Sequence, residues 1–100
     1  MAVIVNSLLW QVLVLADMSI EYLGFMRADI VKYGADAKYI YKVSMVKTGK
    51  YGIYGTGWAN GSDTLQSALL FCESHAQGYL DNNGKPTQKL VGKLTRMAYK

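Results

Sequence analysis

The stretch YIYKVSMVKTGKYGIYGTGWANGSDTLQSALLFCESHAQGYL, residues 39–80, decides the fold expected for this chain. Its first half holds two runs rich in β-branched and aromatic residues, 39–46 and 51–58, joined by Lys-Thr-Gly-Lys. A short linker with a glycine in the left-handed region is typical of a β-hairpin, which we therefore predict. The second strand also contains glycines, which weaken a strand and indicate bulging or close backbone approach. These glycines are Gly52, Gly55 and Gly57.

The second half of the stretch is predicted to be an amphipathic helix over residues 63–81. Asp63 and Gln66 fit a capping box, with Asp63 as the N-cap and Gln66 three residues later. Apolar residues then recur at helical spacing and give the helix one buried face. They are Leu65, Ala68, Leu69, Cys72, Ala76, Tyr79 and Leu80. A hairpin or small antiparallel sheet covered by this helix makes the expected fold α+β.

The flanking segments are predicted to be helical. Residues 2–16 are apolar on nearly every side, which indicates an element buried in the core or in a contact between copies of the chain. Their β-branched residues leave a strand open as the alternative. Residues 20–33 suit a second helix, capped by Asp17 or Ser19, although they also alternate as a strand does. The segment 87–100 has helical spacing and predicts a basic C-terminal helix.

Composition favours one globular domain spanning residues 1–100. Of these 100 residues, 51% are hydrophobic and 18% are charged, far from the signature of disorder. The single cysteine, Cys72, cannot form an intramolecular disulfide, so a reducing cytoplasmic location is expected. The apolar run 2–16 is shorter than the ~20 residues of a membrane span. It also lacks a preceding basic residue, so neither a membrane span nor secretion is expected.

The positive charge is concentrated at one end of the chain. Residues 1–84 carry six basic and seven acidic side chains, whereas residues 85–100 carry five basic side chains and no acidic one. We call these five the basic stripe: Lys85, Lys89, Lys93, Arg96 and Lys100. Their spacing places them along one side of a helix, where they could follow a phosphate backbone or form an ordinary solvated face.

The predicted hairpin interleaves lysines with aromatic residues. Cations beside aromatic rings suit single-stranded nucleic acid, whose bases stack on the rings. The simpler alternative is that the rings form the side of a sheet that packs on helices. The lysines are Lys38, Lys42, Lys47 and Lys50, and the aromatic residues are Tyr39, Tyr41, Tyr51, Tyr54 and Trp58.

No motif in the sequence predicts catalysis, a cofactor or a metal. A zinc site needs three or four ligands, and Cys72 and His75 are the only cysteine and histidine. The glycines of 49–57 lie within a predicted strand rather than before a helix, which does not suit a phosphate-binding loop. No two carboxylates are spaced for acid–base chemistry. Three polar residues are predicted to form a solvated helix face: Glu73, Gln77 and Asp81.

The segment GSDTLQSAL at 61–69, followed by YLDNNGKP at 79–86, resembles HicB-type antitoxins. The resemblance covers residues 38–86 and implies a hairpin that leads into a helix ending in Gly-x-Pro. This chain lacks the Pro-x-Leu-Pro-Gly-Cys stretch that the family places before the helix, and it has 35 further residues in front. The resemblance is thus a guide to architecture, with an antitoxin-type module as one implied function.

These observations favour a small non-catalytic protein, regulatory or adaptor in type, that acts by binding a protein partner. Direct nucleic-acid binding through the basic stripe and the hairpin is the first alternative. A structural subunit of a larger assembly is the second, with residues 2–16 as the contact between copies.

Overall fold

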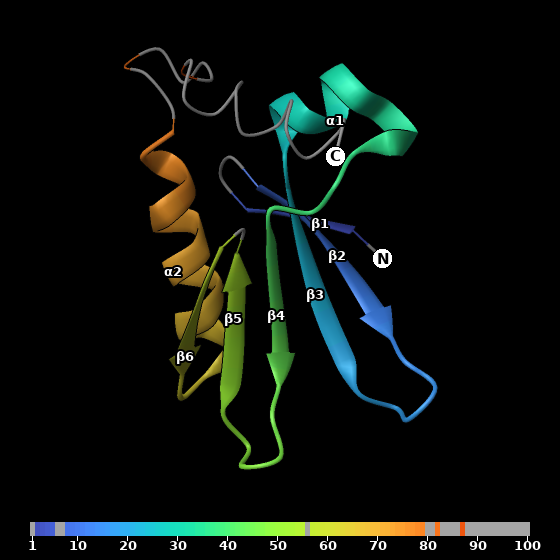
Figure 1. Ribbon diagram of the computed structural model, residues 1–100, viewed down its shortest axis with the longest axis vertical. Coiled ribbons are helices and arrows are strands. Elements are labelled where there is room, and N and C mark those ends of the chain that lie inside the picture. Colours follow the sequence, from blue (N-terminus) through green and yellow to red (C-terminus); the bar gives the residue numbers. More distant parts are fainter. Residues whose placement is uncertain (1, 6–7, 56, 80–81, 83–86, 88–100) are drawn as a thin grey trace.

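The computed structural model describes residues 2–5, 8–55, 57–79, 82 and 87 (Figure 1). Six antiparallel strands form one sheet in which spatial order follows chain order. The strands are β1 (Ala2–Val5), β2 (Leu8–Val14), β3 (Ile20–Met26), β4 (Tyr41–Met45), β5 (Tyr51–Gly55) and β6 (Trp58–Ser62). Helix α1 (Arg27–Tyr33) and a short 3-10 helix (Gly34–Asp36) separate β3 from β4, and helix α2 (Leu65–Gln77) follows β6. The expected α+β fold is confirmed.

The predicted hairpin is the pair β4–β5. Gly49 in its turn has a φ of 82°, which confirms the left-handed glycine. The prediction of one strand over 51–58 is wrong, because β5 ends at Gly55 and the chain reverses into β6. Gly57, with a φ of 81°, supplies the backbone conformation for this reversal, which most other residues adopt only at a cost.

Aromatic rings lie over two of the glycines in this region. A Cβ atom on Gly52 would lie 2.6 Å from the Tyr54 hydroxyl, and one on Gly55 would overlap the Trp58 indole. The expected close approach at these glycines is therefore confirmed. The absent side chains make room for the rings.

The helix predicted over residues 2–16 is wrong, because these residues contribute strands β1 and β2. In β2, Leu8 and Trp10 are buried while Gln11 is exposed, which is the two-residue alternation of a strand. Residues 20–33 divide between the two alternatives, since β3 takes the first seven residues and α1 the last seven. Segments rich in β-branched residues fit a strand that has neighbours on both sides, because the neighbouring strands pair with its backbone N–H and C=O groups.

Helix α2 confirms the best-defined prediction, with one correction at its start. Thr64, in an extended conformation, is the N-cap, and its side chain accepts a hydrogen bond from the Ser67 N–H at 3.1 Å. Asp63 was predicted for that role and instead lies beside Lys50, with 3.5 Å between carboxylate and ammonium. Helix α2 ends at Gln77 with Gly78 as its C-cap, so the predicted end at residue 81 is wrong. Residues 88–100 of the basic helix predicted over 87–100 lie outside the described residues.

The core lies between α2 and the sheet face formed by β4, β5 and β6 (Figure 1). Ten hydrophobic residues are buried there and under the adjoining strands: Leu8, Trp10, Met26, Ile40, Tyr41, Val43, Ile53, Ala68, Cys72 and Ala76. Helix α1 lies at the end of the sheet opposite the β2–β3 and β4–β5 turns. Neither described helix is long and apolar enough to cross a membrane.

Candidate functional site

The hairpin's aromatic residues are divided between the core and the surface. Tyr41 is fully buried, its hydroxyl hydrogen-bonds to His75 Nδ1, and burial raises its pKa. The half-buried Trp58 packs against Tyr41 at 5.9 Å between ring centroids and also contacts His75. Tyr51 is half-buried against the same core. Only Tyr39 and Tyr54 are exposed, so most of the proposed stacking rings are engaged in packing.

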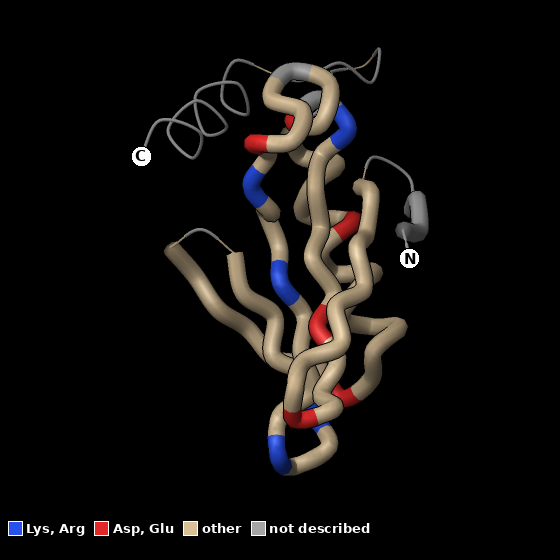
Figure 2. The backbone as a smooth tube through the Cα atoms, turned by 90° about the vertical axis from the view of Figure 1, so that its right-hand side faces the viewer, with Lys and Arg blue, Asp and Glu red and all other residues tan. Residues whose placement is uncertain are grey.

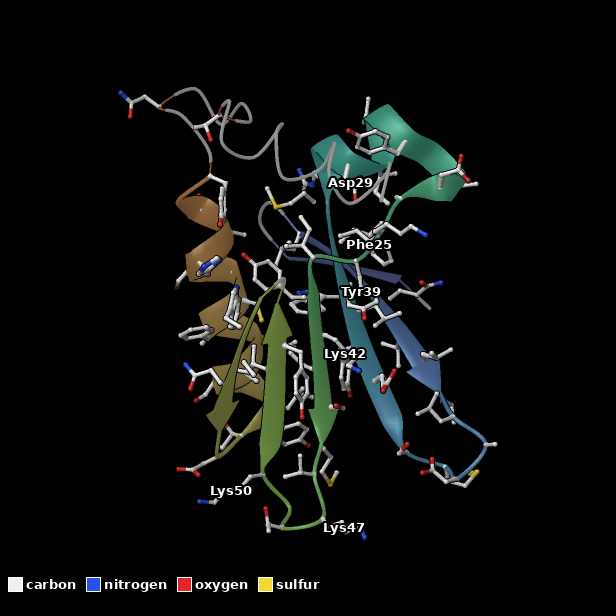
Figure 3. The ribbon with its side chains drawn as sticks, in the orientation of Figure 1. Phe25, Asp29, Tyr39, Lys42, Lys47 and Lys50 are labelled. Atoms are coloured by element: carbon white, nitrogen blue, oxygen red, sulfur yellow. The ribbon has the colours of Figure 1, made fainter. Side chains whose placement is uncertain are left out.

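The hairpin's lysines are divided in the same way (Figure 3). Lys42 lies in the middle of the sheet, 3.9 Å from the Glu21 carboxylate and 5.2 Å from the centre of the Tyr54 ring. Lys50 is paired with Asp63 at the sheet's lower end. Lys47, in the β4–β5 turn, has no ion pair among the residues that the structure describes. The basic stripe lies outside the described residues.

The structure describes the side chains of five basic and six acidic residues. Figure 2 shows the two signs interspersed along the tube rather than gathered into one field. A phosphate backbone binds where basic groups form a patch or stripe. The described part of the chain therefore offers individual cations and no continuous basic surface.

The side chains considered for metal binding or nucleophilic chemistry belong to the core. Cys72 is fully buried, and this burial raises the pKa of its thiol to about 12. A thiol in that state is a small hydrophobe rather than a nucleophile. No cluster of three potential metal ligands occurs in the described ranges. The predicted solvated face is wrong at Glu73, which is buried, whereas Gln77 on the same helix is exposed.

Asp29 in α1 is a second buried carboxyl group that sequence reasoning did not single out. It is 2% exposed, and its Oδ2 atom has no hydrogen-bond partner. Burial raises the pKa of Asp29, and a hydrogen bond from the Lys38 backbone N–H offsets part of that effect. The causes of this pKa shift include no second titratable side chain, so Asp29 does not show the coupled pair that acid–base catalysis uses. The buried Asp29 carboxyl group therefore matters for the stability of the fold, and its protonated form is the one that folding favours.

The most distinctive surface is a line of exposed hydrophobic side chains at one end of the sheet. We call it the apolar row: Val14, Met18, Ile20 and Met45. Val14 pairs with Ile20 across β2 and β3. Glu21 pairs with Ser44, which places Ile20 beside Met45 on the neighbouring strand. Exposure reaches 59% at Val14 and 55% at Met45. Val14 and Ile20 lie on β2 and β3, whereas the strands that α2 mainly contacts are β4, β5 and β6.

The β2–β3 turn holds its part of the row in a defined conformation. The Asp17 carboxylate accepts hydrogen bonds from the Ser19 N–H at 3.0 Å and from the Ser19 hydroxyl at 2.6 Å. Leu15 N–H donates to Ser19 O, and Met18 N–H donates to Leu15 O. Met18 has a φ of 69° and is 77% exposed. This left-handed conformation costs a residue with a side chain about 1–2 kcal/mol.

The β4–β5 turn is fixed by similar bonds at the other side of the row. Val46 N–H donates to Lys50 O at 2.8 Å, and Gly49 N–H donates to Val46 O at 3.0 Å. The two turns lie at the same end of the sheet (Figure 1). Both therefore present their exposed side chains from hydrogen-bonded loops. Such preorganisation lowers the entropy cost of binding.

Opposite charges flank the apolar row. Asp17 stands at the β2–β3 turn, and its bonds from Ser19 lower the pKa of its carboxyl, so the group is ionised at neutral pH. Lys47 and Lys50 stand at the β4–β5 turn (Figure 3). Sequence reasoning missed this arrangement. One feature of the sequence could have indicated it. Met18 stands between Asp17 and Ser19, two residues typical of turns, at a position where a polar residue or glycine is usual.

Comparisons of the chain with protein-family models, with curated proteins and with solved structures find no match. The resemblance to HicB-type antitoxins therefore rests on the residues quoted for it.

Proposed function

We propose that this chain is a small non-catalytic regulatory or adaptor protein that binds a protein partner through the apolar row. The observation that carries the proposal is Met18, an apolar side chain that is 77% exposed in a left-handed backbone conformation. Strained residues persist where structure or function requires them. The Met18 side chain packs little within its own chain, so a contact outside the chain is the better reason for its presence.

The surroundings of Met18 support this proposal. Adjacent exposed hydrophobic groups on a folded protein mark interaction surfaces more often than isolated ones do. Methionine is also adaptable and occurs often in binding surfaces. The flanking charges would form the polar rim that such interfaces have around an apolar centre.

Affinity capture with matched variants tests the proposal. Met18→Gly removes the side chain and keeps the turn, whereas Leu70→Ser removes another exposed apolar side chain, from α2, where Leu70 is 52% exposed. We expect wild type and Leu70→Ser to retain one specific partner that Met18→Gly loses. Equal capture of the partner by all three proteins would show that the apolar row is not the binding surface.

Nucleic-acid binding is a second candidate, favoured by Lys42 lying over the Tyr54 ring on the sheet face opposite α2. It ranks second because Lys42 and Lys50 are each close to a carboxylate and because Tyr41 is buried. Fluorescence anisotropy with single- and double-stranded oligonucleotides at about 50 and about 200 mM salt decides the matter. Binding with a steep salt dependence supports this candidate, and no binding at low salt removes it.

A further inference from the structure

The charges and apolar groups at the lower end of the sheet follow one order across the strands. Because the strand order is β2–β3–β4–β5, Asp17 lies at one end of the apolar row and Lys47 at the other. Ile20 and Met45 occupy the middle, on adjacent strands. The surface therefore has an acidic end, an apolar centre and a basic end. A surface with this order is complementary to itself when it is turned by 180°.

We propose that the partner of the apolar row is a second copy of this chain, in a two-fold symmetric dimer. In such a dimer each contact between two different residues occurs twice. An axis passing between Ile20 and Met45 places Ile20 of one copy against Met45 of the other. The same rotation places Asp17 of each copy opposite Lys47 of the other. This inference rests on the proposed function and specifies its partner.

Both charges are suited to this pairing. Lys47 is exposed and has no ion pair among the described residues. Asp17 is also exposed, and its bonds from Ser19 hold the carboxylate in one orientation. Lys50 reinforces the basic end, although it is shared with Asp63. A parallel arrangement would instead place like charges together, so the charges select the two-fold arrangement.

The size of the surface limits the strength of the dimer. Stable interfaces bury ~800 Å² on each partner, with about 20–30 residues a side. The apolar row and its charged ends are smaller, so we expect a dimer that dissociates in the micromolar range or above. Its ion pairs lie at the solvent-exposed ends, where salt screens them. Dimerisation should therefore weaken as salt rises.

A charge exchange tests the arrangement. Sedimentation velocity at protein concentrations between about 1 µM and about 1 mM measures the dissociation constant of the dimer. Lys47→Asp and Asp17→Lys each place like charges together at both ends of the interface. We expect each change alone to raise the dissociation constant about 3- to 30-fold, because exposed ion pairs are individually weak and two are lost. The double variant restores both pairs in reversed order and should return to the wild-type value.

Matched variants control for folding and for total charge. Asp17→Asn keeps the oxygen that accepts from Ser19 but removes the charge, so it should weaken the dimer even where Asp17→Lys disturbs the turn. Lys38→Asp and Asp36→Lys make the same charge changes at exposed positions outside the row and should leave the dissociation constant unchanged.

The outcomes separate this inference from the proposed function. Rescue by the double variant supports the two-fold dimer. A dimer insensitive to all these changes, or single variants that the exchange does not rescue, overturns it. A wild-type chain that stays monomeric throughout also overturns it. The proposed function survives that result if Met18→Gly still loses a different captured protein, and fails with the inference if it does not.

Discussion

Replacing Met18 by glycine should stabilise the fold while abolishing binding at the apolar row. Met18 has a φ of 69°, and relief of this left-handed conformation contributes about 1–2 kcal/mol. Glycine offsets part of this gain, about 0.4–1 kcal/mol, by adding conformational freedom to the unfolded chain. The side chain is 77% exposed, so little packing is lost. Taking the middle of each range, we expect a net gain of about 0.8 kcal/mol in the free energy of unfolding.

Urea denaturation followed by circular dichroism measures this gain as a higher midpoint with an unchanged slope. By thermal unfolding the gain corresponds to a rise in Tm of roughly 2–8 °C for a domain of this size. Met18→Ala is the matched control, since it removes the same side chain but keeps a Cβ atom in the left-handed region. Its stability should stay close to wild type. Both variants should lose binding equally.

A loss of stability in Met18→Gly would refute the reasoning. It would mean that the methionine packs within its own chain and that its exposure does not reflect a binding role. Equal stability of the glycine and alanine variants would show that the left-handed conformation costs no more than the conformational freedom that glycine adds to the unfolded chain. Stabilisation without loss of binding would retain the strain argument and reject Met18 as a contact residue.

Three further changes test the account of the fold. Asp29→Asn should raise stability near pH 7 and have little effect below about pH 4, because burial raises the pKa of Asp29 and its protonated form is favoured by folding. Urea midpoints across that range should show the wild type losing stability as pH rises through the folded-state pKa, and parallel curves for the two proteins would contradict this. Gly55→Ala should cost about 1–3 kcal/mol because the new Cβ atom meets the Trp58 ring. Gly61→Ala should cost far less, because its Cβ atom would meet only the Tyr51 carbonyl oxygen, at an ordinary contact distance of 3.8 Å; similar thermal midpoints for the two variants would reject the ring contact. Thr64→Ala should cost about 1 kcal/mol as the loss of the α2 N-cap, and Asp63→Ala about 0–1 kcal/mol as the loss of an exposed ion pair. Chemical denaturation ranks these two, and the reverse order would restore Asp63 as the cap.

Local patterns predicted the hairpin and α2 because their signals lie close together in the chain. The β4–β5 turn needs one left-handed glycine, and Gly49 provides it within a four-residue linker. Helix α2 has a capping residue followed by apolar residues at helical spacing. The error of one residue at its cap arose because Asp63 and Thr64 both accept hydrogen bonds well. Local rules do not separate two adjacent candidates.

The segment 2–16 shows where local patterns fail. Its apolar, β-branched residues are compatible with a buried helix and with a buried strand. The choice depends on β3, which pairs with β2 along its whole length. Trp10 packs over Gly24 of β3, a contact between residues fourteen positions apart. Such pairings are properties of the assembled sheet and leave no short-range signal.

The sequence by itself determined an α+β fold with a central hairpin, a capped amphipathic helix and an uneven distribution of charge. Only the tertiary structure decided which of its hydrophobic residues face water. Val14, Ile20 and Met45 have the same character as the buried Leu8 and Trp10 on their sheet. They differ because Leu8 and Trp10 belong to the buried cluster that includes Tyr41, whereas Val14, Ile20 and Met45 lie at the end of the sheet next to the two turns. The exposure of a side chain on a strand depends on which other parts of the chain pack over it, and the residues of the strand itself do not determine that packing.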